Sequence, residues 1–411
     1  MAELKYWIWL ASRRGVGRKS ATRLLDIFNT PEKLYFAREI EYKAAGLTPM
    51  EISSLSDKDL ATANKAIEDC RRMNFGIISY EDAMYPERLR NIYDPPLVLY
   101  YKGGLPFIDD EAVVAIVGTR TCTDYGVKTA ERLGYEFAVS GGVVVTGLAR
   151  GIDSAAAHGA LKAGGRVIGV IGNGLDIVYP PDNIDLYRAV EATGAIISEY
   201  APGTPPRAAN FPQRNRIISG LSLGVVVVEA PKASGSLITA SLALEQGRDV
   251  FAVPGNIDAA ACLGSNQLLK DGAGTLTSGW DLVGEYIGMF PDRLSLPSRK
   301  TQAPQEAVCE IAPAKASGKA AKRGDKVEKE RKKEIDKDEI LEYIDLVTER
   351  EALSEHEALI LRAILNKVAH IDEIIETSGL DAPKALAALT MLEIKGVVSQ
   401  TEGKKFRIII N

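Results

Sequence analysis

The chain has 411 residues, of which 46% are hydrophobic and 26% are charged, and its formal net charge is −5. This length exceeds that of one small domain and predicts two to four domains of ordinary globular composition. A negative net charge excludes a protein that coats nucleic acid over its whole surface, but not a local basic groove, because salt screens charges beyond about 8–10 Å.

Membrane, secreted and metal-binding classes are also disfavoured. The sequence has no apolar run long enough to span a bilayer, and its first residues lack a secretory signal pattern. Four cysteines lie scattered without CxxC spacing, and three histidines show no ligand spacing. We therefore expect a cytoplasmic protein with no membrane contact and no metal.

The first half of the chain predicts two kinds of structure. Residues 1–75 show apolar positions at helical spacing, chiefly in 19–28 and 59–73, and predict a helical domain. In residues 76–290, runs rich in Val and Ile alternate with helical segments that begin at glycine. Runs that are apolar on both faces are typical of a parallel sheet covered by helices on both sides, so an α/β Rossmann-like domain is expected. The runs are GIISY, PLVLYY, AVVAIVG, GGVVVTG, RVIGVIG, AIISEY, GVVVVEA and DVFAVPG.

The last part of the chain predicts a linker and a further domain. Residues 291–337 are dense in Lys, Glu, Ala and Pro, which is typical of a charged linker. Residues 338–411 return to helical periodicity three times and close with two strand-like segments around Glu402 and Gly403. Three helices followed by a hairpin indicate a winged helix.

The strand ends of the predicted sheet carry the candidate chemistry. In an open parallel sheet, ligands bind at the carboxyl ends of the strands, and glycine lets a phosphate approach the backbone. Helices that begin there offer free amide groups to anions. Arginines recur within or beside these loops, namely Arg120, Arg150, Arg207, Arg214 and Arg216, and Phe211 provides a ring on which a base stacks. The pattern predicts a site for the phosphates of nucleic acid.

Cofactor and enzyme readings have less support. The G-x-G-x-x-G fingerprint and the P-loop are both absent, so we expect no dinucleotide or other cofactor. Glu199 and Glu229 end strands that look adjacent. Such a pair of carboxylates could perform acid–base catalysis, which is the alternative to a site that only binds. Carboxylates at sheet edges also orient loops by accepting backbone N–H bonds, and we expect no catalytic residue.

Many blocks, in order, resemble the DprA/Smf family. They are residues 85–103, 114–120, 146–161, 172–183, 198–222, 227–255 and 263–273. The resemblance implies a Rossmann-like core that forms a homodimer and binds single-stranded DNA. It further implies protection of incoming strands and loading of RecA during natural transformation, without enzymatic activity.

The resemblance also implies which residues act. The family's phosphate-binding motifs map onto Gly118, Thr119, Arg120, Gly147, Arg214, Asn215, Gly235 and Ser236, and Phe211 is the expected base-stacking residue. Arg207 stands near the place where the family often carries a Lys or Arg before a Phe-Pro pair.

The segments on either side of the Rossmann-like domain also resemble known elements. Residues 13–25 resemble a helix-hairpin-helix or SAM-like element, whose Arg13, Arg14, Arg18 and Lys19 either touch phosphates or form a solvated helix end. The C-terminal segment resembles the family's winged helix, except that 402–406 read EGKKF where a two-glycine wing is usual. The rival functions are a nucleotide-processing phosphoribohydrolase, whose PGGxGTxxE loop residues 234–245 partly echo, and a scaffold that binds no DNA.

Overall fold

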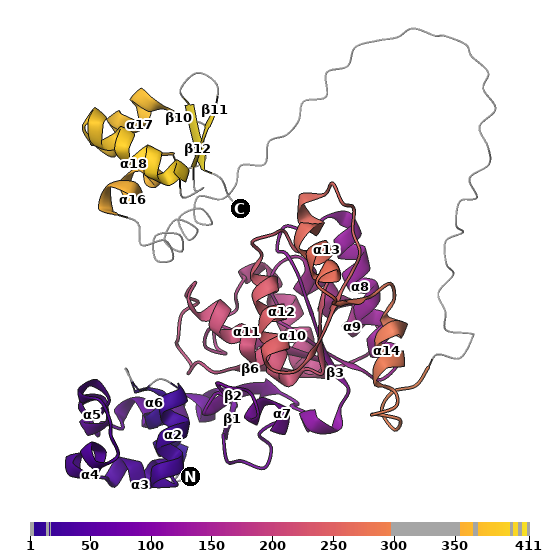
Figure 1. Ribbon diagram of the computed structural model, residues 1–411. Helices are drawn as coiled ribbons and strands as arrows, with labels where there is room; N and C mark the ends of the chain where they lie inside the picture. The colour runs from indigo at the N-terminus through magenta and orange to yellow at the C-terminus, as the bar shows by residue number, and fades with distance from the viewer. Residues whose placement is uncertain are drawn as a thin grey trace, which may run out of the picture. The chain divides into compact units, whose positions relative to one another are not determined.

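The computed structural model describes residues 4–13, 16, 18–296, 354–364, 369–394, 398–401 and 405–408 (Figure 1). The chain divides into two units, residues 1–302 and 303–411. No helix in the described part of the chain has the length and apolar character that a membrane span requires.

Six helices form the N-terminal part of the first unit. They are α1 (Leu4–Ala11), α2 (Arg18–Phe28), α3 (Pro31–Phe36), α4 (Glu39–Ala44), α5 (Pro49–Ser56) and α6 (Ala61–Met73). The helices predicted in 19–28 and 59–73 are α2 and α6. Thr30 and Thr48 cap α3 and α5, each followed by a proline at the first helical position. Trp9, Leu24 and Leu55 are fully buried and hold these helices together.

Arg13 is used inside this helical part. Its guanidinium lies 2.8 Å from the Asp57 carboxylate and donates to the Asp57 carbonyl at 2.9 Å. It also lies 5.5 Å from the Trp9 ring. We expected Arg13 either to contact phosphates or to be solvated at a helix end. It does neither, because its side chain is packed against its own domain. Arg14 and the side chains of Arg18 and Lys19 lie outside the described residues.

One nine-stranded sheet forms the centre of the first unit. Its strands are β1 (Gly76–Ser79), β2 (Val98–Gly103), β3 (Val113–Val117), β4 (Val143–Thr146), β5 (Val167–Ile171), β6 (Ala195–Ser198), β7 (Gly224–Val227), β8 (Asp249–Ala252) and β9 (Gly274–Thr275). The spatial order is β1-β2-β6-β5-β4-β3-β7-β8-β9. The seven strands from β6 to β9 run parallel, so the α/β Rossmann-like prediction is confirmed.

Two strands differ from the predicted parallel sheet. β1 and β2 pair with each other in antiparallel register, and β2 is antiparallel to β6. A parallel pair needs a crossover that covers one face of the sheet, usually with a helix. Only the four-residue helix α7 (Glu87–Arg90) lies between β1 and β2, so the chain turns back at this edge. The two-residue strand β9 was not predicted either, since it is too short to leave a pattern.

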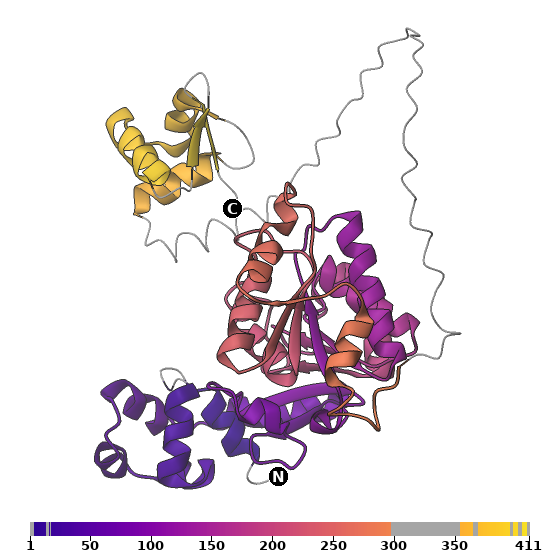
Figure 2. The same ribbon diagram turned by 45° about the vertical axis from the view of Figure 1, so that its right-hand side comes forward.

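Alternate residues of the strands pack against different helices. Val114, Ile116 and Val144 belong to one buried cluster with residues of α8 (Asp124–Val139), α9 (Ile152–Lys162), α10 (Ile184–Thr193) and α14 (Gly279–Tyr286). Ala115 and Val145 belong to another, with residues of α7, α11 (Asn210–Leu221) and α12 (Gly235–Glu245). This alternation is that of a strand buried on both faces, and Figure 2 shows the helices on either side of the strands.

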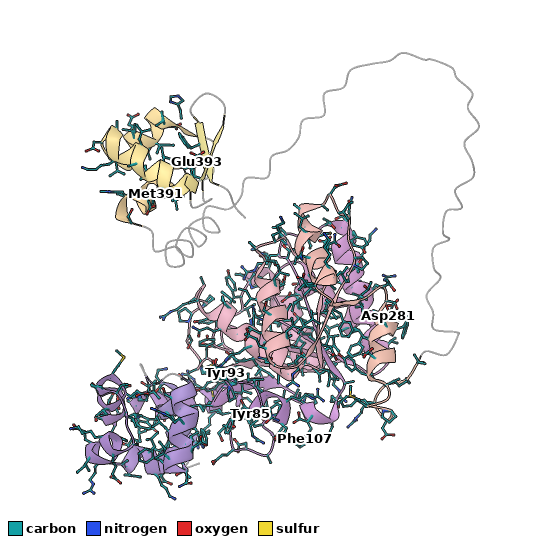
Figure 3. All side chains as sticks on the ribbon, viewed as in Figure 1. Tyr85, Tyr93, Phe107, Asp281, Met391 and Glu393 are labelled. Atoms are coloured by element: carbon teal, nitrogen blue, oxygen red, sulfur yellow. The ribbon has the colours of Figure 1, made fainter. Side chains whose placement is uncertain are left out.

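The segment after β8 closes the first unit. It contains α13 (Leu263–Lys270) and α14. Elsewhere in the unit, and directly before α13, short 3-10 turns occur at Ile108–Asp110, Pro181–Asn183 and Ala260–Cys262. The carboxylate of Asp281, labelled in Figure 3, accepts from the amides of Thr277 and Ser278 at 2.9 Å each and so fixes the start of α14.

The second unit has the predicted winged-helix order. Its elements are α16 (Glu355–Ile364), β10 (Ala369–His370), α17 (Ile371–Ser378), α18 (Ala382–Ile394), β11 (Val398–Thr401) and β12 (Lys405–Ile408). The strands pair antiparallel in the order β10-β12-β11, and β10 is an addition to the predicted three helices and hairpin. The linker residues 297–337 and the wing residues 402–404 lie outside the described residues.

Candidate nucleic-acid interface

The carboxyl edge of the sheet gathers the loops that the sequence singled out. Strands β5, β4, β3 and β7 are consecutive neighbours in the sheet. The residues that directly follow them are Gly172, Gly147, Gly118 and Val228, respectively. Helices α8, α9 and α12 begin after β3, β4 and β7. Asn210, the first residue of α11, donates its side-chain amide to the Gly172 carbonyl at 2.8 Å. Four helix N-termini thus lie along one edge, which favours negative charge there.

The glycines that directly follow β3 and β4 are required by packing within the protein. A Cβ on Gly118 would lie 2.9 Å from the Glu229 carbonyl and 2.6 Å from the Ile152 side chain. A Cβ on Gly147 would lie 2.1 Å from Nη1 of Arg214. The loops are therefore close to their own protein. Close approach of a phosphate, the reason we expected glycine at these positions, is not needed to explain them.

Two amides expected to face phosphate already have internal acceptors. Gly147 donates to Oδ2 of Asp153 at 2.9 Å, and Thr119 donates to the Glu229 carbonyl at 2.8 Å. Asp153 is the second residue of α9, where a carboxylate is favoured by the helix dipole. Thr119 itself is only 7% exposed. These internal hydrogen bonds fix the loops at the sheet edge and leave neither amide free to bind a phosphate.

Arg214 is placed differently from the prediction that it grips phosphate at the surface. It is 4% exposed and lies beneath the Gly147 loop, where its Nη1 donates to the Val170 carbonyl. Its position one turn after Phe211 turns the side chain inward on α11. Burial raises the pKa of Asp153, while the nearby Arg214 and the Gly147 amide oppose that shift. Arg214 thus supports the edge from below.

Arg120, unlike Arg214, is exposed to solvent. Its guanidinium carbon lies 5.5 Å from the centroid of the half-buried Phe211 ring. Arg214 approaches the same ring at 5.9 Å, and the ring of Tyr179 lies 5.4 Å away at an angle of 32°. Within the described part of the chain, no carboxylate lies within ion-pair distance of Arg120. An exposed cation beside an aromatic ring suits a nucleotide, which carries both a phosphate and a base.

The remaining predicted residues lie around this centre or at the start of α12. Arg207 is exposed in the loop before α11. Asn215 donates to the Gly235 carbonyl at 3.3 Å and so ties α11 to α12. Gly235 is exposed with open space around it, and the Ser236 hydroxyl lies 2.7 Å from that of Ser234.

The pair of carboxylates that could perform acid–base catalysis does not form. Glu199 follows β6 and Glu229 follows β7, and three strands separate β6 from β7, so the prediction that they end adjacent strands is wrong. Glu199 accepts from Arg216 at 2.7 Å. Glu229 is fully buried and accepts from the amide and hydroxyl of Thr123 at 2.9 and 2.5 Å. Glu229 thus holds a loop through a backbone amide, as the other reading expected, whereas Glu199 is paired with an arginine side chain of α11.

Tyr179 and Asp153 were not among the predicted site residues. Tyr179 belongs to the loop after β5, and its aromatic ring among prolines and glycines was the available signal. Asp153 follows a glycine-rich turn at a helix start, a pattern that also occurs where a carboxylate only caps. Among the described residues, no group of three His, Cys, Asp or Glu side chains is arranged to hold a metal ion.

The doubly wound sheet, its anion-suited edge and the separate winged helix define a Rossmann-like binding protein with an appended helical module. Residues 76–286 match the family of the DNA recombination-mediator protein A, and residues 347–404 match the DprA winged helix domain. The chain belongs to this DprA/Smf family.

Individual relatives agree with this assignment. The chain is 32% identical over 418 residues to protein Smf of Synechocystis sp., covering 99% of both chains. It is 45% identical over 214 residues to DNA processing protein DprA of Streptococcus pneumoniae, covering 52% of this chain and 74% of that one. The X-ray structure of DprA from Streptococcus pneumoniae superposes with a TM-score of 0.61 at 36% identity, covering 68% of this chain and 97% of that one.

Proposed function

We propose that this protein binds single-stranded DNA at the carboxyl edge of its sheet and acts in DNA processing during transformation and recombination, as a binder and not as an enzyme. The observation that carries the proposal is the exposed Arg120 beside the ring of Phe211. Family membership supports the same function.

The proposed contacts divide into two groups. Arg120 and Arg207 bind phosphates with their side chains, together with the exposed Gly235 at the start of α12, where Ser236 is only 7% exposed, and Phe211 stacks on a base. Gly118, Thr119, Gly147, Arg214 and Asn215 act from within, because their contacts fix the loops that present the first group.

We expect a strong preference for single strands over duplex DNA. A base stacks on Phe211 only when it is free to leave its pairing partner, which the paired and stacked bases of a duplex are not. The test is a gel shift with single- and double-stranded DNA of one sequence at two salt concentrations. Binding of the single strand should weaken as salt rises, since phosphate contacts release counterions. Equal affinity for the two forms of DNA contradicts the proposal.

We further propose that the protein is a homodimer that loads RecA on the bound strand, as the family resemblance implies. Residues 224–285 include Ile238, Leu244 and Ile257, which are 44%, 62% and 78% exposed and provide apolar surface for a partner. A dimer joins two DNA sites and raises avidity through effective concentration. Sedimentation should show a dimer at micromolar concentration. A monomer that binds DNA undiminished contradicts the dimer, and failure to stimulate RecA filaments on single strands contradicts loading.

The rival phosphoribohydrolase is tested separately. The rival rests on the partial loop resemblance in residues 234–245, and the separation of Glu199 from Glu229 by three strands offers it no acid–base pair of carboxylates. Incubation with nucleoside monophosphates should release no free base. Release of a base would establish the enzyme.

A further inference from the structure

Arg120, Arg214, Tyr179 and Gly172 lie around the ring of Phe211 at the sheet edge. Arg120 lies at 5.5 Å and Arg214 at 5.9 Å from its centroid, and Tyr179 lies at 5.4 Å. The fourth neighbour is Gly172, where an added Cβ would lie 3.1 Å from Cδ1 of the ring.

Three of these neighbours are fixed in place. Arg214 is 4% exposed, bonded to the Val170 carbonyl and pressed against Gly147. Gly172 is buried main chain whose carbonyl accepts from Asn210. The Tyr179 backbone is held by a 2.8 Å bond from the Tyr187 hydroxyl to its carbonyl.

Arg120 is the neighbour that is able to leave. It is exposed, and the described residues give it no ion pair, so its contact with the ring is its main attachment. A cation over a ring at an exposed site is held more weakly than a guanidinium bonded to a phosphate. A phosphate at this edge therefore competes with the ring for Arg120.

We propose that Arg120 covers Phe211 in the free protein and exchanges the ring for a backbone phosphate when single-stranded DNA binds, so that a base takes its place on the ring. This rests on the proposed function, single-stranded DNA binding. One side chain then couples the two recognition events. A phosphate alone uncovers the ring, whereas a base without a phosphate meets a covered ring.

The coupling explains how this edge selects its ligand. Inorganic phosphate or a base-free backbone satisfies Arg120 but leaves Phe211 exposed to water. Duplex DNA offers phosphates, but its bases are paired and stacked. Only a strand whose bases turn outward satisfies both groups at once.

The test places a tryptophan at the ring. Phe211→Trp is titrated with two oligodeoxynucleotides of about twelve nucleotides, one of thymidines and one abasic throughout, and binding is followed independently by anisotropy of a label on the DNA. The abasic strand should shift the emission of the introduced tryptophan, because Arg120 leaves it. The thymidine strand should shift the emission and also quench it by stacking. Tyr179→Trp is the second reporter if Phe211→Trp fails to fold.

The decisive comparison adds Arg120→Gln to each reporter. The emission shift with the abasic strand should disappear, while quenching by the thymidine strand remains at roughly tenfold higher DNA concentration. Arg188→Gln, which removes an exposed charge from α10, is the matched control and should retain the abasic shift. An abasic shift that persists in Arg120→Gln overturns the exchange, as does thymidine binding without quenching. If neither strand binds by anisotropy, it is the proposed function that has failed.

Discussion

Replacement of Arg120 by alanine is expected to weaken binding of single-stranded DNA by roughly tenfold to a hundredfold and to leave the thermal midpoint nearly unchanged. A charge-assisted contact with phosphate contributes about 1.5–3 kcal/mol, and each 1.4 kcal/mol is about tenfold in Kd. Within the protein the substitution removes the contact with Phe211, which contributes about 0.5–1 kcal/mol at an exposed site. Affinity and thermal midpoint are to be measured on the same preparation.

The same measurement on Arg188→Ala separates a specific contact from general charge. Arg188 is exposed on α10 and pairs with Asp185 within its own helix, so its loss should change affinity little. The structure has already removed one competing role for Arg120, because Glu199 and Glu229 are bound by Arg216 and Thr123 instead. A large fall in the midpoint of Arg120→Ala with affinity retained would show that Arg120 is structural.

The fold was predictable where hydrophobic pattern decides it. Runs such as AVVAIVG and GGVVVTG are rich in valine and apolar on both faces, and β3 and β4 are buried throughout. The direction of β2 was not predictable in the same way, because a buried antiparallel strand has the same composition as a parallel one. The lack of a long helical pattern between β1 and β2, where the structure has only the four-residue helix α7, was the available signal.

The candidate site was predictable in its location but not in the direction of its side chains. Arg120 and Arg214 both lie near the ends of strands, in a loop or near the start of a helix. No sequence pattern shows which of the two side chains is exposed. One is exposed and the other is 4% exposed, because α11 turns Arg214 toward the Gly147 loop. Such a difference depends on tertiary packing, which no local pattern records. For the same reason the internal acceptors of the Gly147 and Thr119 amides were not foreseen.

Arg216 lies two residues after Arg214 and is expected to give the opposite result to Arg120. Its Nε lies 3.1 Å from the Asp94 carboxylate, and its Nη2 lies 2.7 Å from that of Glu199. The Arg216 side chain is 7% exposed, and that of Glu199 is 12% exposed. The guanidinium therefore joins α11 to the segment before β2 and to the end of β6, with little solvent around the pair.

Arg216→Ala is expected to lower the free energy of unfolding by about 3–5 kcal/mol, because two carboxylates lose their shared cation in a region of low exposure. The thermal midpoint should fall by on the order of 10 °C in a domain of this size. Below that midpoint, affinity for single-stranded DNA should be retained within roughly threefold, since the side chain points into the protein. Arg216→Lys should recover only part of the stability, because an ammonium does not reach both carboxylates as a planar fork does. An unchanged midpoint together with lost affinity would instead place Arg216 on the DNA, and the buried ion pairs would then have to open when the strand binds.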